Sequence, residues 1–284
     1  MSIILGFLAG VGLPIQTSVN TRLRKKVGSP YNASLVSFVV ALLFLSALLL
    51  ITGQGLHIPL AQLLNEPAWI WIGGICGLVF LTGNILLFSK LGGVQTVVLP
   101  VLGQILMGLI IDNFGLFYSQ KTPLSVFRIA GAVMVILGVV LVSMAKENKT
   151  ASEKLQKSES TTLWIWRAFG IFAGMLSATQ IAVNGYLGKV VGSPIKASAI
   201  SFTVGIIFLA IICIVLHFKN GKSESFKNES AKNPWWMWIG GILGGLYILA
   251  NVYLSRIVGT GKGLDNRSRG AFRGRCGVPV YSLS

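Results

Sequence analysis

Amide side chains recur at the same spacing in two distant parts of the chain. Gln16 and Asn20 lie four residues apart near the end of an apolar run, and Gln180 and Asn184 repeat them 164 residues later. Residues four apart share one face of a helix, and polar groups within hydrocarbon must find hydrogen-bonding partners. These side chains could line a binding site for a polar solute, or they could hydrogen-bond helix to helix and hold a bundle together. The residues alone leave both interpretations open.

Three further amides and one carboxylate are candidates of the same kind. Asn84 and Asn251 form a second repeated pair, for which a pathway role and structural hydrogen bonding are both open. Gln104 follows in the next apolar run, after Gly103, and Asp112 ends that run. A carboxylate in a membrane is a candidate for coupling transport to an ion. At the end of a run, Asp112 could equally be an interfacial residue.

Patterns typical of catalysis or metal binding are missing from the sequence. His57 and His217 are isolated, and there is no zinc spacing, no paired carboxylates, no nucleophile beside a base and no phosphate-binding loop. The three cysteines are too few and too scattered for a disulfide framework. We therefore expect no enzymatic activity, no cofactor and no metal.

The candidate residues lie on apolar segments long enough to cross a bilayer. The chain of 284 residues is 53% hydrophobic and 11% charged. Its apolar residues gather in runs of about twenty, the length that crosses about 30 Å of hydrocarbon. We predict an all-α, multi-pass membrane protein with eight spans, at Ile3–Val19, Ala33–Ile51, Trp69–Phe88, Val94–Ile111, Val126–Met144, Ile165–Val183, Ala197–Leu216 and Trp235–Tyr253.

One membrane unit occurs twice in the sequence. Gly28–Phe38 returns as Gly192–Phe202, an offset of 164, with seven of eleven residues identical. Pro67–Asn84 returns as Pro234–Asn251, an offset of 167, with nine of eighteen identical. A duplicated membrane unit is the usual construction of secondary transporters. We assign residues 1–145 to a first repeat of five spans, and residues 163–261 to a second, incomplete repeat of three.

The basic residues predict how the two repeats are oriented. If the N-terminus lies outside, the cytoplasmic loops hold 13 Lys and Arg residues and the external loops, counted before Arg256, hold 3, as the positive-inside rule favours. Because a repeat of five spans is odd in number, the second copy would enter the membrane upside down. We therefore predict an inverted repeat, the symmetry that lets a transporter alternate between outward-open and inward-open states. The polar stretch 146–162 would be the cytoplasmic linker between the repeats.

The second repeat departs from the first beyond Gly259, the residue that aligns with Gly92. The first copy continues into a span, whereas residues 262–284 carry five basic residues and one acidic residue. Several arginines in one segment forbid a span, since each is costly at the membrane centre. We expect an aberrant basic tail in place of spans nine and ten, caused by a frameshift or truncation. The alternative is a functional basic tail that binds anionic lipid or nucleic acid.

The motifs together resemble a known family. The YdcZ-type branch of the drug/metabolite transporter superfamily is similar over about residues 1–261, through Gln16-x3-Asn20, Gly28-Ser29-Pro30, Ser37-Phe38, Trp69-x-Trp71-x-Gly73-Gly74, Gly103-Gln104 and Ile111-Asp112-x2-Gly115. The resemblance implies an EmrE-like architecture of two antiparallel five-span units, with eight of ten spans present, in the cytoplasmic membrane of a bacterium. It also implies export of small molecules. Gln16 stands where the small multidrug exporters of that superfamily have a glutamate, so the resemblance does not extend to proton antiport through this position.

We therefore expect a secondary transporter that exports small metabolites or drug-like solutes by alternating access between two inverted repeats. The alternative is a non-transporting membrane scaffold or partner subunit, or an inactive truncated product. The expected partners are the lipid bilayer and a small-molecule substrate, and the sequence leaves homo- and hetero-oligomers open. The net charge of +16 is spread over the loops between spans, so it predicts topology and not nucleic-acid binding.

Overall fold

Helices are the only regular elements in the described part of the chain. The computed structural model describes residues 2–58, 60–150, 157–220 and 234–258, which confirms the all-α class. The elements are α1 (Ser2–Val27), α2 (Pro30–Ile51), α3 (Leu60–Leu64), the 3-10 helix η1 (Ala68–Trp71), α4 (Ile72–Phe114), the 3-10 helix η2 (Leu116–Tyr118), α5 (Val126–Thr150), α6 (Lys157–Val190), α7 (Pro194–Asn220), the 3-10 helix η3 (Trp235–Trp238) and α8 (Gly240–Val258).

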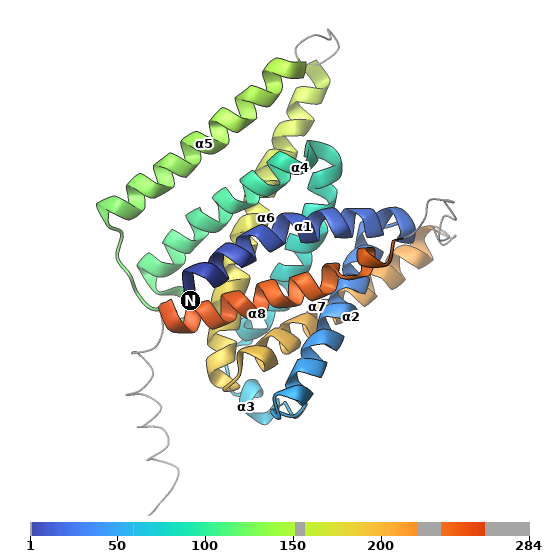
Figure 1. Cartoon of the computed structure of the whole chain (residues 1–284), viewed down its shortest axis with the longest axis vertical. Helices are drawn as coiled ribbons and strands as arrows, with labels where there is room; N and C mark the ends of the chain where they lie inside the picture. Colours follow the sequence, from blue (N-terminus) through green and yellow to red (C-terminus); the bar gives the residue numbers. More distant parts are fainter. Residues whose placement is uncertain (1, 59, 151–156, 221–233, 259–284) are drawn as a thin grey trace, which may run out of the picture.

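Each predicted span falls within a helical segment. In the described residues, four helices are long and apolar enough to cross a membrane, namely Pro30–Ile51, Ala68–Phe114, Thr162–Val190 and Pro194–Lys219, and two shorter ones, Val126–Val139 and Gly240–Leu254, are also apolar. The segment Ala68–Phe114 contains two of the predicted spans. Gly92, with φ 77° and ψ 174°, interrupts α4 between them. Its two limbs meet at a sharp bend (Figure 1).

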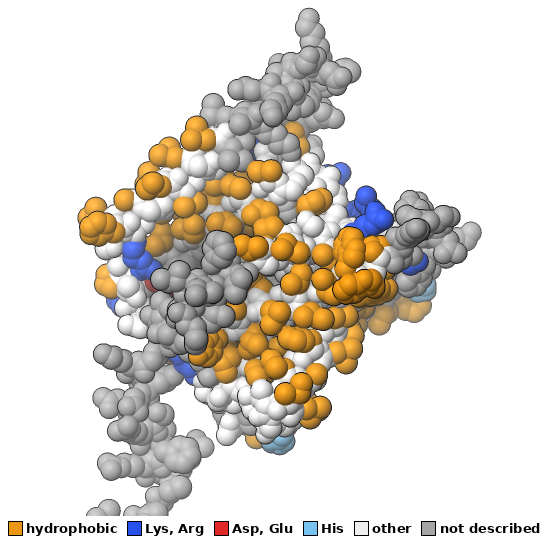
Figure 2. All heavy atoms as spheres, in the orientation of Figure 1, with side chains coloured by type: hydrophobic (Ala, Val, Ile, Leu, Met, Phe, Trp, Pro, Cys, Tyr) orange, Lys and Arg blue, Asp and Glu red, His pale blue; other side chains and the backbone are white. Residues whose placement is uncertain are grey.

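Successive limbs run back and forth between two ends of the bundle (Figure 1). One end, which we call the α1–α2 end, also holds the bend of α4 and the beginning of α8. The other, the α6–α7 end, also holds α3 and the last residues of α4. Apolar side chains cover most of the face in Figure 2, and the Lys and Arg visible there lie near its edges. This is the surface expected of helices that face lipid.

The repeated Gly-Ser-Pro element forms the same turn twice. Gly28 and Gly192 adopt positive φ values of 79° and 71°, a conformation that glycine adopts without strain. Ser29 then caps α2 by accepting a hydrogen bond from the backbone N–H of Tyr31, at 3.3 Å. Proline follows as the first helical residue of α2 and of α7, where its missing N–H would have no helical partner. The element is therefore a helix start in both halves.

The second limb of α4 packs against α6 backbone to backbone. A Cβ atom on Gly103 would overlap the carbonyl oxygen of Ile171, and one on Gly174 would overlap the carbonyl oxygen of Pro100. Such close approach needs glycine on both helices. This crossing holds α6 beside the bend of α4 and places Gln104 against the interior of the bundle.

Helix extends into both sides of the predicted linker. α5 continues to Thr150 and α6 begins at Lys157, so the linker predicted at 146–162 begins and ends in helix. Residues 151–156 and the whole of the predicted tail, 262–284, lie outside the described residues.

Candidate functional site: a row of amides between the two halves

Each predicted asparagine of the first pair lies against a glycine of the other half. A Cβ atom on Gly73 would overlap Oδ1 of Asn184, and a Cβ on Gly240 would overlap Oδ1 of Asn20. Both asparagines are fully buried, at 0% exposure. Gly73 and Gly240 are equivalent positions in the two repeats, as are Asn20 and Asn184. The same contact is therefore made twice, with the two halves exchanged.

The glutamines one helical turn away repeat this arrangement. The amide of Gln180 lies against Gly77, and the amide of Gln16 lies against Gly244. Gln180 and Gln16 are 3% and 6% exposed. Gly73 and Gly77 lie four residues apart, as do Gly240 and Gly244. The space at these glycines is filled by the side-chain amides of the other half. We call these four side chains, Gln16, Asn20, Gln180 and Asn184, the amide row.

Backbone contacts beside the amide row are exchanged in the same way. A Cβ on Gly74 would overlap the carbonyl oxygen of Ser201 in α7, and a Cβ on Gly241 would overlap the carbonyl oxygen of Ser37 in α2. Between these contacts, the rings of Phe38 and its equivalent Phe202 meet edge to face, with centroids 4.9 Å apart. Two equivalent residues touch each other only where the two halves are related by a local two-fold arrangement.

Hydrogen bonds satisfy the amide row only in part. Ser37 Oγ donates to Asn20 Oδ1 at 2.6 Å, and Asn184 Nδ2 donates to the equivalent Ser201 Oγ at 3.1 Å. In the described residues, Asn20 Nδ2, Asn184 Oδ1 and Gln180 Oε1 are buried and have no hydrogen-bond partner. A buried polar atom without a partner costs about 1–3 kcal/mol. The row thus offers donors and acceptors to a polar solute or to water.

The other predicted amides lie in different surroundings. Gln104 Nε2 donates to Ser177 Oγ at 3.1 Å and to Tyr247 Oη at 3.2 Å, which joins α4 to α6 and α8. Asn84 is buried and its Oδ1 has no partner in the described residues. Its equivalent, Asn251, donates to the carbonyl oxygen of Tyr247 on its own helix at 2.8 Å. The two asparagines are therefore equivalent in sequence but not in hydrogen bonding.

Asp112 lies apart from these amides, at the C-terminal end of α4. It forms an ion pair with Arg128 at the start of α5, and both side chains are about one-third exposed. The backbone carbonyl of Asp112 also accepts a hydrogen bond from the N–H of Thr122, at 2.7 Å. These contacts fasten the connection between α4 and α5. An ion-coupling role for Asp112 stays a prediction.

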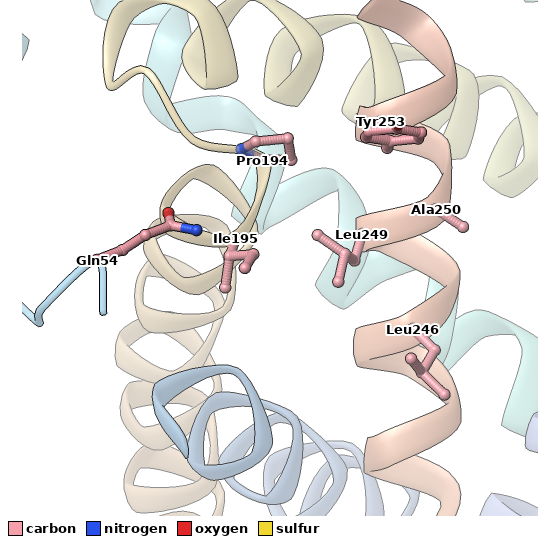
Figure 3. A pocket seen from close by; sticks show the side chains of 7 residues that line it. All are labelled: Gln54, Pro194, Ile195, Leu246, Leu249, Ala250 and Tyr253. Carbon is pink, nitrogen blue, oxygen red and sulfur yellow. The ribbon is translucent and has the colours of Figure 1, made fainter. Parts of the chain in front are cut away.

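An apolar pocket of about 460 Å³ opens near the α6–α7 end. Figure 3 shows Pro194 and Ile195 at the start of α7 opposite one side of α8, with Gln54 as the single polar amide. Pockets that bind small molecules commonly measure about 300–1,000 Å³. Ser193 donates a hydrogen bond to Gln54, and Lys196 Nζ donates to the carbonyl oxygen of His57 at 3.0 Å. The loop after α2 is thereby fixed over the α6–α7 turn. The amide row does not line this pocket.

The sequence did not identify some polar residues of the interior as candidate site residues. Ser37 and Ser201 belong to the repeated Ser-Phe element, and this repetition was the available signal. Gln95, 2% exposed with an unpartnered Nε2 in the described residues, follows the bend of α4 and was readable as an amide at the edge of an apolar run. No sequence pattern pointed to Ser177 and Tyr247, because their partner Gln104 is 73 and 143 residues away along the chain.

Comparison with known proteins identifies the family of the chain. Residues 1–141 and 165–264 match the sequence profile of the family described as "Putative inner membrane exporter, YdcZ". The "Inner membrane protein YdcZ" of Escherichia coli strain K12 is 29% identical over 149 residues, which are 50% of this chain and 95% of that protein. That relative therefore corresponds to about half of this chain. No solved structure matches. The chain is a multi-pass inner membrane protein and belongs to this YdcZ family.

Proposed function

We propose that this protein is a secondary transporter that exports a small solute by alternating access between two inverted repeats. The observation that carries the proposal is the exchange of contacts between the halves, in which Asn184 meets Gly73 as Asn20 meets Gly240. Two antiparallel copies of one unit can adopt each other's conformation, and this exchange reverses the side of the membrane to which a central site opens. The family to which the chain belongs supports export.

The amide row is the site that we propose for the solute. It lies where the two halves meet, it is buried, and three of its polar atoms have no partner in the described residues. Amide donors and acceptors in an apolar surrounding select a solute that is polar but small. We do not assign a charge to the solute from these residues, because amides bind neutral and charged groups alike.

Transport by reconstituted protein tests this proposal. Purified protein in proteoliposomes would be loaded with unlabelled amino acids, small amines or sugars, and counterflow of the labelled compound would be measured. We expect saturable counterflow for at least one class. Gln180→Leu and Gln16→Leu should each lower its rate by up to about tenfold, because one lost hydrogen bond to the solute costs about 0.5–1.5 kcal/mol and about 1.4 kcal/mol corresponds to a factor of ten.

The control is Gln62→Leu, which removes an exposed amide of α3 and should leave counterflow unchanged. Thermal unfolding of each variant would show that the fold is retained. Counterflow that is equal in all three variants would refute the amide row as the site. An absence of counterflow across the whole panel would favour the non-transporting scaffold.

The proposed orientation has its own test. Arg24, one of the basic residues that follow the first predicted span, donates from Nη1 to Ser89 Oγ beside the bend of α4, at 2.5 Å. This contact supports the view that these basic residues lie at the α1–α2 end. We propose that this end is cytoplasmic and the N-terminus external. In a chain with its native cysteines replaced by serine, Gln120→Cys should react with an impermeant maleimide in intact cells. Lys25→Cys should react only after permeabilisation, and the reverse pattern would refute the orientation.

A further inference from the structure

Aromatic side chains from three distant segments meet around a carboxylate at the α6–α7 end. The rings of Trp69, Tyr118 and Tyr186 contact one another pairwise, with centroids 4.9–5.6 Å apart and planes tilted by 41–49°. Tyr186 Oη donates a hydrogen bond to Glu66 Oε2 at 2.6 Å. The rings come from η1, η2 and the end of α6. We call Glu66, Trp69, Tyr118 and Tyr186 the aromatic–carboxylate cluster.

The backbone that carries Tyr118 is strained. Phe117 and Tyr118 have φ values of 56° and 54°, and they are the only residues other than glycine with positive φ in the described part of the chain. Bulky side chains adopt this conformation rarely, and such strain persists only where surrounding contacts enforce it. Here the strain directs the Tyr118 ring against Trp69 and Tyr186 while leaving that side chain 54% exposed. An aromatic surface therefore stays exposed at the α6–α7 end, next to the Tyr186 that binds Glu66.

The equivalent positions in the opposite repeats do not carry the acidic and phenolic side chains of this cluster. Trp69 has an equivalent, Trp236, but Glu66 corresponds to Asn233 and Tyr186 corresponds to Arg22. Packing contacts of the amide row recur in both halves, whereas Glu66 and Tyr186 have no acidic or phenolic counterpart at their equivalent positions. A residue needed merely to pack the repeat would be expected in both copies.

We propose that the aromatic–carboxylate cluster binds an organic cation of the alkylammonium class. Aromatic faces attract cations through the ring quadrupole, most strongly where the cation loses water, and tilted rings present several faces to one ligand. The Glu66 carboxylate adds the opposite charge, and Tyr186 orients it by donating to one oxygen. The site lies outside the amide row and does not require transport, so it can be tested apart from the proposed function.

Binding of choline to the purified full chain tests this proposal. 3,3-Dimethyl-1-butanol, the neutral analogue of the same shape, is the control ligand, and both would be titrated by calorimetry at low salt. We expect saturable choline binding in the millimolar range, with the neutral analogue at least tenfold weaker. Glu66→Gln keeps an acceptor for Tyr186 and should weaken choline binding about tenfold. Tyr118→Ala should weaken it several-fold.

The matched control is Tyr31→Ala, which removes a half-buried tyrosine from the start of α2, at the α1–α2 end, and should not change choline affinity. Thermal unfolding would confirm that Glu66→Gln and Tyr118→Ala are folded. Equal affinity for choline and its neutral analogue would overturn the proposal. So would choline binding that survives both substitutions, or no saturable binding at tens of millimolar choline, because the rings would then serve only to pack the loops.

Discussion

Gly103→Ala tests the closest helix crossing in the bundle. The added Cβ would overlap the carbonyl oxygen of Ile171, and it would lie 2.8 Å from the Ile171 carbonyl carbon and 3.0 Å from the Met175 nitrogen. Ordinary contact begins at 3.4 Å, and the overlap with the Ile171 oxygen is the deepest of the three, so α6 must move by more than about 1 Å. All three neighbours are backbone atoms, which cannot rotate away as a side chain can. The crossing must therefore open, and Gln104 on the adjacent position must move with it.

Gly108→Ala on the same limb of α4 is the control, because a Cβ there has no neighbour within 4 Å. Both substitutions gain the same helix propensity of up to about 1 kcal/mol, which cancels in the comparison. Overpacking costs about 1–3 kcal/mol, so we expect Gly103→Ala to be less stable than Gly108→Ala by this amount. Reversible unfolding in mixed detergent micelles would measure the difference. Equal free energies of unfolding would refute the close crossing of α4 and α6.

Three further predictions follow from single positions. Gly74→Ala and Gly241→Ala should each lower the free energy of unfolding by about 1–3 kcal/mol, because each Cβ meets the backbone of the opposite half; a loss in only one of them would contradict the exchange of contacts. Gly92→Ala should cost about 1–3 kcal/mol in the same assay because φ is 77° there, whereas Gly93→Ala, whose Cβ would sit 3.5 Å from the Phe88 ring, should be close to neutral. Tyr247→Phe should cost about 0.6–1.7 kcal/mol by removing an acceptor of Gln104, and an equal effect of Tyr253→Phe would show that the hydrogen bond is not the cause.

The membrane helices were readable in the sequence because each requirement for a span is local. An apolar run of sufficient length is visible residue by residue. All eight predicted spans fall in helical segments, and in the described residues four helices are long and apolar enough to cross a membrane and two shorter ones are also apolar. The amide row was readable because the chain repeats it, so that Gln16 and Asn20 point to Gln180 and Asn184. Which glycines these amides contact was not readable, because Gly73 and Asn184 are more than a hundred residues apart and belong to different repeats.

The other features that the sequence did not predict have the same physical origin. Glu66 and Tyr186 are 120 residues apart in sequence, and each alone resembles an ordinary loop or interfacial residue. The positive φ of Phe117 and Tyr118 contradicts the usual preference of aromatic residues, so no propensity could predict it. The ion pair between Asp112 and Arg128 joins two residues that the sequence placed at separate span ends. Each feature depends on how helices pack, which short-range patterns do not encode.

The differences between the two halves carry information that their shared contacts cannot. A contact made by both halves, such as that of an asparagine with a glycine, is the same from either side of the membrane if the repeats are inverted. It can hold the halves together or bind a solute, but it cannot make the two sides of the membrane differ in affinity for that solute. Any difference in affinity between the two sides must arise from positions where the copies differ, and in the described residues these include Tyr186 against Arg22. We therefore expect the double exchange Tyr186→Arg with Arg22→Tyr to change the ratio of the solute affinities measured from the two sides of proteoliposomes before it lowers the free energy of unfolding.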